Sequence, residues 1–424
     1  MLYLGTRLYH LDLAPARSLT EDEYAWTWSG MTLIQRGTPE AWSMLTAYLP
    51  VRRNIEWRGH RYRMVKPWLD HPPLYALYAG GWMLALGQRD MFEVDLWQMR
   101  LGSLLLDAVC FVLLSLVLRR LLPTAEILVA LLLYAVMPAI VLHQRLVICE
   151  NMYVPLTLGI LLLLLQQSRE FARARALAIF ALCAALPLLK VAALTSSVFL
   201  LLWALIDGAP RERWISAGTI ALGTGTGLGV YLWYAQHVDA NLFWEVMTNQ
   251  QDRWKGFAGM EALLFTPRLV NQGLRDLLAV LGCVLALASL TLPRMAAWGL
   301  AVLAYTACMA FFMDQERVYG WYFLPLYPWF CTALGVAIVH ASRQRVLGLS
   351  LLWCTVAWLT IASVLHGRTQ LPVDVLRYGY LAGLLLLYGA WAAWPVLARA
   401  SIPIVNGVLL GGAALACLYE VHAR

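Results

Sequence analysis

The amino-acid sequence predicts an all-α protein, a polytopic bundle of transmembrane helices with interfacial helices and loops on its outer face. Three observations indicate this fold class. Of the 424 residues, 61% are hydrophobic and 13% are charged; the apolar residues gather in runs of about 17–20; and arginines recur in every second connection. A helix needs about 20 apolar residues to cross a bilayer, where it satisfies its backbone polar groups internally. This composition excludes a soluble enzyme built around one large core.

The apolar runs predict twelve membrane helices. We expect them near residues 99–118, 124–143, 150–167, 174–189, 191–206, 214–234, 276–292, 295–313, 321–340, 346–365, 376–395 and 402–419. Residues 1–13 are apolar but too short to span, so they are either the tail of a further helix whose beginning is missing or a short interfacial stub, and the count is twelve or thirteen. Residues 72–88 are also short, and we expect an interfacial helix with Tyr75, Tyr78 and Trp82 at the headgroup level.

The arginines predict the orientation of the helices. The positive-inside rule assigns to the cytoplasm the connections that hold Arg119, Arg120, Arg169, Arg173, Arg175, Arg211, Arg213, Arg294, Arg343, Arg345 and Arg399. The extracytoplasmic face then holds a first outer loop of about 14–98, a second of about 235–275, and the turns at 144–149, Lys190 and 314–320. The net charge is +7, but the basic residues are dispersed among membrane turns, so nucleic acid is not an expected partner. The eight cysteines are scattered without metal-ligand spacing, so we expect no disulfide framework.

Four clusters of ionisable residues lie on the predicted outer face. Such residues favour a functional interpretation, because an unpaired charge in the membrane costs roughly 2.5–3.5 kcal/mol on insertion scales. The first cluster is Glu21-Asp22-Glu23. Adjacent carboxylates disfavour full ionisation together, so one of them could act as a base or hold a cation. The alternative is a helix N-terminus with Thr20 as N-cap and Glu23 completing a capping box. Both interpretations hold if Asp22 points into a cavity.

The second and third clusters also have structural interpretations. Asp70 and His71 precede a double proline that fixes the entry into the interfacial helix. An Asp-His pair is more often a local hydrogen bond than a catalytic group. Arg145 and Glu150 flank the turn before a membrane helix, where an arginine can snorkel and a glutamate can stabilise the helix dipole.

The fourth cluster joins Lys190, alone between two apolar runs, with the segment that holds Arg317 and Tyr322. A lone lysine can simply mark a short outer turn. Lys190 and Arg317 both lie at the predicted level of the lipid phosphates, so they are candidates for contacts with a lipid phosphate.

Taken in this order, the four clusters resemble the lipid-linked-sugar-dependent membrane glycosyltransferases of the GT-C class, particularly the protein O-mannosyltransferase and aminoarabinose transferase branch. Asp22-Glu23 matches the Asp-Glu motif that follows the first membrane helix of that family, and His71-Pro72-Pro73-Leu74 matches its H/K-P-P-hydrophobic motif. Three further segments are similar to its later motifs: Gln144-Arg145 with Glu150 five residues after the arginine, Lys190 in a later outer turn, and Arg317 through Pro328.

The sequence departs from the family pattern in three of these segments. Glu150 stands where Asp is commoner, Gln144 replaces a small hydroxyl residue, and several residues separate Arg317 from Tyr322. The resemblance covers residues 1–330 and implies a GT-C-like transmembrane catalytic module there, with additional transmembrane helices in 331–424.

The resemblance implies a glycosyltransferase that moves a hexosyl or pentosyl group from a polyprenyl-phosphate donor to a lipid, glycan or protein acceptor. It implies direct displacement with inversion, at the extracytoplasmic face of the cell's inner or plasma membrane. Asp22 is expected to be the base that takes the acceptor's proton, assisted by Glu23, with Glu150 as a further catalytic carboxylate.

The remaining expected roles concern the donor and a metal ion. Residues expected to bind the donor phosphate are Lys190, Arg145, His71 and Arg317, and two others are expected in the site, Asp70 and Tyr322. Asp22 and Glu150 could hold a divalent cation, since hard cations prefer carboxylate oxygens. Metal dependence stays open.

Two other function classes fit parts of the sequence. A lipid or amphiphile transporter would show internal repeats and broken helices in matching halves, and no repeat is visible in the sequence. A polysaccharide ligase or polymerase would usually carry its key Arg and His in a large late loop, whereas the acidic groups here lie early. The basic run 51–66 could bind anionic headgroups or an anionic acceptor, and a solvated loop explains it equally well. Trp244, Trp254 and Phe257 are placed to cover an active site.

Overall fold

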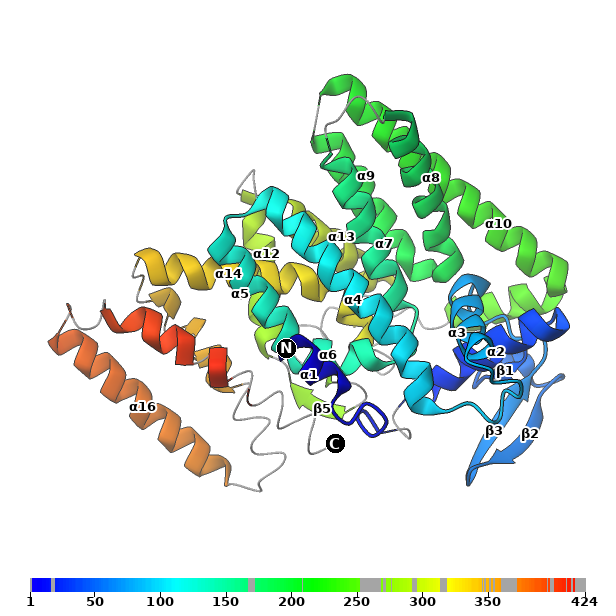
Figure 1. Cartoon of the computed structure of the whole chain (residues 1–424), viewed down its shortest axis with the longest axis horizontal. Coiled ribbons are helices and arrows are strands. Elements are labelled where there is room, and N and C mark those ends of the chain that lie inside the picture. The colour runs from blue at the N-terminus through cyan, green and yellow to red at the C-terminus, as the bar shows by residue number, and fades with distance from the viewer. Residues whose placement is uncertain are drawn as a thin grey trace.

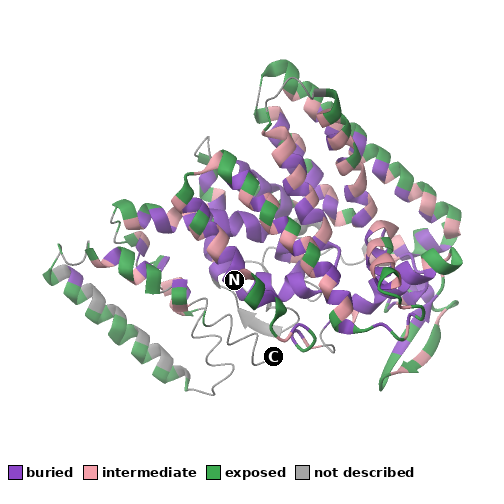
Figure 2. Ribbon diagram, viewed as in Figure 1, coloured by how far each residue is buried: buried purple, intermediate pink, exposed green. Residues whose placement is uncertain are grey.

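The computed structural model describes residues 2–16, 20–166, 172–207, 209–251, 268–269, 272–275, 277–291, 296–312, 319–344 and interrupted stretches of 346–415. Helices dominate these residues and confirm the predicted fold class (Figure 1). The centre of the bundle is buried, whereas the outer helices show alternating buried and exposed faces (Figure 2).

The bundle helices occur close to the predicted positions. In chain order they are α4 (Leu96–Leu121), α5 (Thr124–Val136), α6 (Pro138–Arg145), α7 (Glu150–Leu164), α8 (Ala172–Leu189), α9 (Leu194–Ile206), α10 (Pro210–Gln251), α12 (Leu277–Ala288), α13 (Ala296–Phe312), the 3-10 helix η7 (Gly320–Leu326), α14 (Tyr327–Gln344) and α16 (Val373–Ala393). A short helix, α1 (Leu2–Leu8), packs on α5 and α6. The predicted domain boundary at residue 330 falls inside α14, which packs on α5 and α12 as part of the bundle.

Several helices are shorter than the predicted spans. Among the described residues, three helices are long and apolar enough to cross a membrane, Leu96–Leu121, Pro210–Gln250 and Gly320–Gln344, and the bent pair α5 and α6 can form a fourth span. Several further apolar helices, among them α7, α12 and α13, have 10–17 residues, fewer than the roughly 20 residues of a full span. The hydropathy of the sequence therefore predicted where helices occur, but it did not predict interruptions such as the one between α5 and α6 that make them shorter.

The break between α5 and α6 has a specific chemical cause. Pro138 has no N–H and cannot bond to the carbonyl of Tyr134, so the helix bends there by 58°. The buried Arg7 of α1 takes over this carbonyl with its Nη2 at 3.0 Å and also donates to the carbonyl of Ala135. The Nε of Arg7 is 2.9 Å from Asp107 of α4, which completes a buried ion pair. The pair satisfies the carbonyls that the bend releases.

Residues 20–95 form a compact unit that we call the first loop domain. It consists of α2 (Asp22–Arg36), β1 (Ala41–Trp42), the 3-10 helix η2 (Thr46–Tyr48), β2 (Arg53–Trp57), β3 (His60–Val65) and α3 (Pro73–Ala85). The strands pair antiparallel in the order β1-β3-β2. One face of the β2–β3 hairpin packs on α2, where the rings of Trp57 and Tyr62 lie 5.1 and 5.3 Å from that of Trp28.

Two glycines allow α2 and α3 to pack with their backbones almost in contact. A Cβ on Gly80 would lie 2.2 Å from the backbone nitrogen of Met31, and a Cβ on Gly30 would lie 1.6 Å from the carbonyl oxygen of Ala76. No side chain fits at either position. This contact fixes the N-termini of α2 and α3 relative to each other.

A helix is present at the position predicted for the interfacial helix, α3, and its aromatic side chains contact protein. Tyr75 is fully buried. The hydroxyl of Tyr78 donates to the carbonyl of Gly102 at 2.7 Å, and the indole of Trp82 donates to that of Gln98 at 2.8 Å. These side chains attach α3 to the N-terminal part of α4, because their polar atoms find backbone acceptors there.

The helix α10 continues well into the segment predicted as the second outer loop. Its helical geometry breaks at Asp239, whose carboxylate accepts a hydrogen bond from the backbone N–H of Leu242 at 3.0 Å and so caps the next helical stretch. The helix then runs to Gln251, so residues 235–251 are helical apart from the break at Asp239. Near its end Asn249 donates to the hydroxyl of Thr46 and Gln250 to the carbonyl of Asp70, both at 2.8 Å. The helix thereby contacts the first loop domain.

Candidate active site

The site residues predicted from the sequence gather around the turn Leu146–Cys149, between α6 and α7. α2 of the first loop domain reaches this turn through Glu23, and within the bundle Lys190 at the end of α8 and Tyr322 of η7 lie beside it. The N-terminal end of α5 and the C-terminal end of α14 lie away from this turn, and an ion pair of 2.7 Å between Glu126 and Arg343 joins them. The polar clusters therefore lie at one end of the bundle, and Arg343 lies at the other end.

Glu23 and Arg100 form a buried ion pair on one side of this turn. Arg100 donates from Nη2 and Nε to the two carboxylate oxygens of Glu23 at 2.7 and 3.1 Å, and both side chains are excluded from solvent. The same carboxylate accepts a hydrogen bond from the backbone N–H of Val147 at 3.0 Å. Arg100 also donates to the carbonyls of Leu11 and Pro15. This pair ties the N-terminal segment, α2, α4 and the turn together.

Asp22 lies at the first residue of α2, immediately before the clamped Glu23. Its side chain is half-buried. The predicted capping box does not form: α2 has no side-chain cap, and the hydroxyl of Thr20 donates to the carbonyl of Ala16. The reason is that Glu23 uses its carboxylate for Arg100 and Val147. Glu23 therefore fixes the position of Asp22, the residue before it.

Glu150 and Lys190 form a second ion pair on the other side of the turn. The Nζ of Lys190 is 2.6 Å from Oε1 of Glu150, and the thiol of Cys149 donates to Oε2 at 3.2 Å. The Nζ also lies 4.4 Å from the ring centroid of Tyr322, a favourable cation–π distance. The lysine side chain is 12% exposed and that of the glutamate 2%. Burial lowers the pKa of Lys190, but the charge of the Glu150 carboxylate in direct contact with it outweighs burial and raises it, so the amine stays protonated.

Arg145 has a structural environment. Its guanidinium is fully buried and donates to the carbonyls of Ala14 and Tyr9 at 2.9 and 2.8 Å and to that of Thr6. These carbonyls lie at and beyond the C-terminal end of α1, where a helix leaves its last acceptors unsatisfied. In this arrangement Arg145 anchors the N-terminal segment and does not face the Lys190–Glu150 pair.

His71 and Asp70 lie at the entry to α3. The imidazole of His71 stacks on Trp26 with ring centroids 4.6 Å apart, and Trp26 in turn packs edge-on against Tyr75. Asp70 accepts a hydrogen bond from the hydroxyl of Ser43 at 2.7 Å, and its backbone carbonyl accepts the bond from Gln250. The predicted site residue Arg317 lies outside the described residues.

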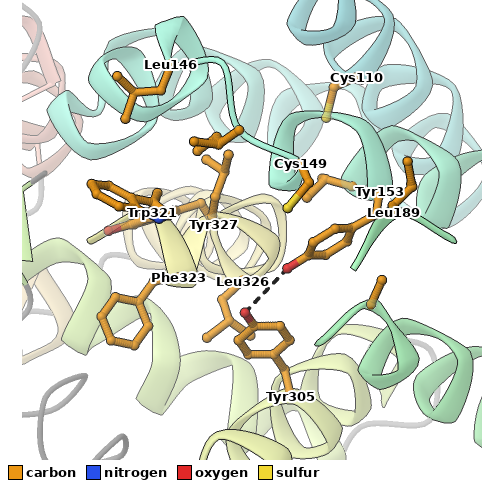
Figure 3. Close-up of a cluster of buried hydrophobic side chains, with 14 of the residues drawn as sticks. Cys110, Leu146, Cys149, Tyr153, Leu189, Tyr305, Trp321, Phe323, Leu326 and Tyr327 are labelled. Atoms are coloured by element: carbon orange, nitrogen blue, oxygen red, sulfur yellow. Dashed lines mark hydrogen bonds between the residues drawn. The ribbon is translucent and has the colours of Figure 1, made fainter. Parts of the chain in front are cut away.

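A small apolar pocket lies next to the Lys190–Glu150 pair. It lies between α7, α9, α13 and η7, and it is lined by Val154, Thr157, Leu158, Thr195, Ser196, Phe199, Ala301, Tyr305, Pro325, Pro328 and Trp329. The hydroxyls of Tyr153 and Tyr305 lie 3.5 Å apart at its edge, below Cys149 (Figure 3). Val154 follows Glu150 by about one helical turn, so the pocket begins about 6 Å along α7 from Glu150.

The described residues hold no group of three His, Cys, Asp or Glu side chains that could bind a metal ion. Both oxygens of Glu150 already have partners, Lys190 and Cys149. Glu150 would have to release at least one of them before it could share a cation with Asp22.

Sequence reasoning missed Arg100, Arg7 and Asp107. The signal was present for Arg100 and Asp107, because both lie in the apolar run predicted as residues 99–118. Ionisable residues inside such a run almost always have a partner. Their partners, Glu23 and Arg7, are 77 and 100 residues away in the chain, a separation that no local pattern reveals.

Comparison with known proteins gives consistent results. Residues 70–235 match the family model described as dolichyl-phosphate-mannose-protein mannosyltransferase. No curated protein sequence matches the chain.

Two solved structures share the fold, ArnT from Cupriavidus metallidurans bound to undecaprenyl phosphate and the same protein in the apo state. Each has a TM-score of 0.60 and 13% sequence identity, over all of this chain and 74% of the ArnT chain. At this identity the likeness shows the fold alone. The family match adds the kind of enzyme. Together they indicate a membrane glycosyltransferase that shares the helical fold of ArnT and is similar, over residues 70–235, to the protein mannosyltransferases.

Proposed function

We propose that the protein transfers a sugar from a polyprenyl-phosphate donor to an acceptor hydroxyl at the extracytoplasmic face of the plasma membrane. The observation that carries this proposal is the buried Lys190–Glu150 pair beside an apolar pocket. An ammonium group has three N–H donors, and Glu150 takes one of them at 2.6 Å. The other two are available to the oxygens of a donor phosphate.

The neighbouring pocket suits the lipid part of the donor. Its lining residues Leu158, Phe199 and Trp329 are apolar and buried. Because Val154 and Leu158 follow Glu150 on the same face of α7, a phosphate at Lys190 leads directly into the pocket. A polyprenyl phosphate has this combination of an anionic head and an apolar tail.

The proposed reaction is a direct displacement with inversion at the anomeric carbon. Asp22 takes the proton of the acceptor hydroxyl, and the hydroxyl oxygen forms a new bond to the anomeric carbon. The bond between that carbon and the phosphate oxygen breaks, and its electron pair leaves with polyprenyl phosphate. Lys190 stabilises the negative charge that grows on the phosphate. Glu23 and Arg100 position Asp22, and His71 remains a candidate contact to the phosphate.

The test uses purified full-length protein and a polyprenyl-phosphate sugar labelled in the sugar. Wild-type protein should release polyprenyl phosphate and glycosylate an acceptor extract. Asp22→Asn, which keeps the shape of the side chain, should abolish turnover and leave donor binding intact. Glu56→Gln, an exposed carboxylate on β2, is the matched control and should retain full turnover.

Full turnover by Asp22→Asn would remove Asp22 from the role of base. Movement of the intact donor across a liposome membrane, without release of polyprenyl phosphate, would replace the enzyme proposal by the transporter alternative.

A further inference from the structure

The helix α10 carries aromatic residues that mark the thickness of the membrane. Trp214 and Trp233 are 73% and 67% exposed, and their separation of 19 positions corresponds to about 28 Å of helix. The hydrocarbon core of a bilayer is about 30 Å thick, and tryptophan favours its two boundaries. The ring of His237 stacks on Trp233 one turn further, and the helix breaks at Asp239. One membrane boundary therefore lies at Trp233–His237.

The segment 44–51 of the first loop domain lies at the level of this boundary. The 3-10 helix η2 packs on α10, and Thr46 accepts the hydrogen bond from Asn249. The pKa of the buried Tyr48 is raised by burial and then by Asp70, and Tyr231 of α10 adds to it, so the two phenol groups are near each other. Tyr231 is two residues before Trp233 in the same helix.

Apolar side chains of this segment are exposed. Met44, Leu49 and Val51 are 64%, 56% and 43% exposed. Scattered exposed apolar residues need no explanation, but these three lie on one short segment beside the membrane boundary. An aqueous environment is unfavourable for them, whereas the interfacial region of a bilayer accommodates them.

Arginines follow these apolar residues directly. The strand register pairs Asn54 with Arg63 and Glu56 with Arg61, so these residues share one face of the hairpin, and Arg52 continues that face by the alternation of a strand. Arg61 and Arg63 are exposed. Within the part of the chain that the structure describes, these three arginines make no ion pair.

We propose that residues 44–53 are a lipid-contacting segment, with Met44, Leu49 and Val51 in the membrane interface and the arginine face of the hairpin on the phosphates of anionic lipids. A surface that is both apolar and rich in arginine fits a bilayer with anionic headgroups, because the apolar side chains enter the membrane interface while the arginines contact the lipid phosphates. Arginine binds phosphate with two parallel hydrogen bonds. The contact would hold the first loop domain, and with it Asp22, at a fixed height above the membrane.

The test measures the depth of single fluorescent labels in the full-length protein. A nitrobenzoxadiazole label is placed on Val51→Cys, just before β2, and, as a matched control, on Glu56→Cys near the far end of β2. Proteoliposomes contain phosphatidylcholine with or without 30% phosphatidylglycerol, and a lipid with a nitroxide in the upper acyl chain, below the phosphates, serves as quencher. Unsubstituted protein reports background labelling of the native cysteines; the described ones are buried, apart from the half-buried Cys308.

We expect the label at residue 51 to be quenched at least twice as strongly as the label at residue 56. Phosphatidylglycerol should increase the quenching, and the triple variant Arg52→Gln, Arg61→Gln, Arg63→Gln should abolish this increase. High salt should weaken the increase in the same way, because these charges are solvent-exposed.

Equal quenching at the two positions would overturn the assignment of residues 44–53. A label at residue 51 that is shielded from water but not quenched by nitroxide lipid would show that protein, such as a second copy of the chain, covers the segment. An unchanged effect of phosphatidylglycerol in the triple variant would remove the arginines from the proposal.

Discussion

Replacing Arg100 by methionine should cost about 3–5 kcal/mol of the free energy of unfolding, since it leaves the buried carboxylate of Glu23 without its counter-charge. The magnitude follows from the geometry. Both side chains are excluded from water, and two hydrogen bonds of 2.7 and 3.1 Å join them. Glu23→Met should cost a similar amount, because it leaves the buried guanidinium of Arg100 without its carboxylate partner.

The double variant separates the ion pair from general damage to the core. If the pair acts as a unit, Glu23→Met with Arg100→Met should lose about 2–3 kcal/mol less than the sum of the two single variants. Part of the loss should persist, because the backbone N–H of Val147 and the carbonyls of Leu11 and Pro15 keep no partner. The assay is denaturant unfolding of the purified protein in detergent, with turnover measured beside it.

Glu126 and Arg343 supply the matched control. Their ion pair is also 2.7 Å long, but the arginine side chain is 55% exposed, so the corresponding double-mutant cycle should give less than about 1 kcal/mol. Losses for Glu23 and Arg100 that add within about 0.5 kcal/mol would refute the reasoning, since independent sites behave in that way.

Three further predictions concern single side chains. Gly80→Ala should separate α2 from α3 and abolish both folding yield and turnover, because its Cβ would lie 2.2 Å from the backbone of Met31; Gly81→Ala, whose Cβ would meet only a side-chain carbon at 3.6 Å, should be tolerated. Lys190→Met should lower turnover by at least 100-fold and Lys190→Arg by less; equal activity of both with wild type would exclude a role for the charge. Cys149 should resist N-ethylmaleimide in the folded protein at pH 8, as burial raises the pKa of its thiol well above the ordinary value; rapid labelling at this residue would show that the turn opens.

Much of the fold could be predicted from the sequence, because an apolar run is recognised from neighbouring residues and needs no knowledge of distant contacts. The β2–β3 hairpin was missed for a different reason. Its charged residues suggested a solvated loop, although Ile55, Trp57, Tyr62 and Met64 alternate with polar residues in the manner of a strand. Arg58 and Gly59 form the two-residue turn, both with positive φ (49° and 75°), the geometry that hairpins prefer.

The candidate site was predictable as a set of residues but not as a set of contacts. Lys190 and Glu150 were expected to act separately, and the structure pairs them. Arg145 was expected at the donor phosphate, and the structure places it on the carbonyls of Thr6, Tyr9 and Ala14. The sequence could not show this, because the partners of Arg145 are backbone atoms about 130 residues earlier.

The buried ions of α4 have a consequence for biosynthesis. Arg100 and Asp107 enter the bilayer on an otherwise apolar helix, and each isolated charge adds roughly 2.5–3.5 kcal/mol to the cost of insertion. Their counter-ions, Glu23 and Arg7, both precede α4 in the chain, so the ribosome has already released them when α4 reaches the translocon. The order of synthesis therefore lets both charges of α4 be neutralised as it inserts, without waiting for any downstream helix.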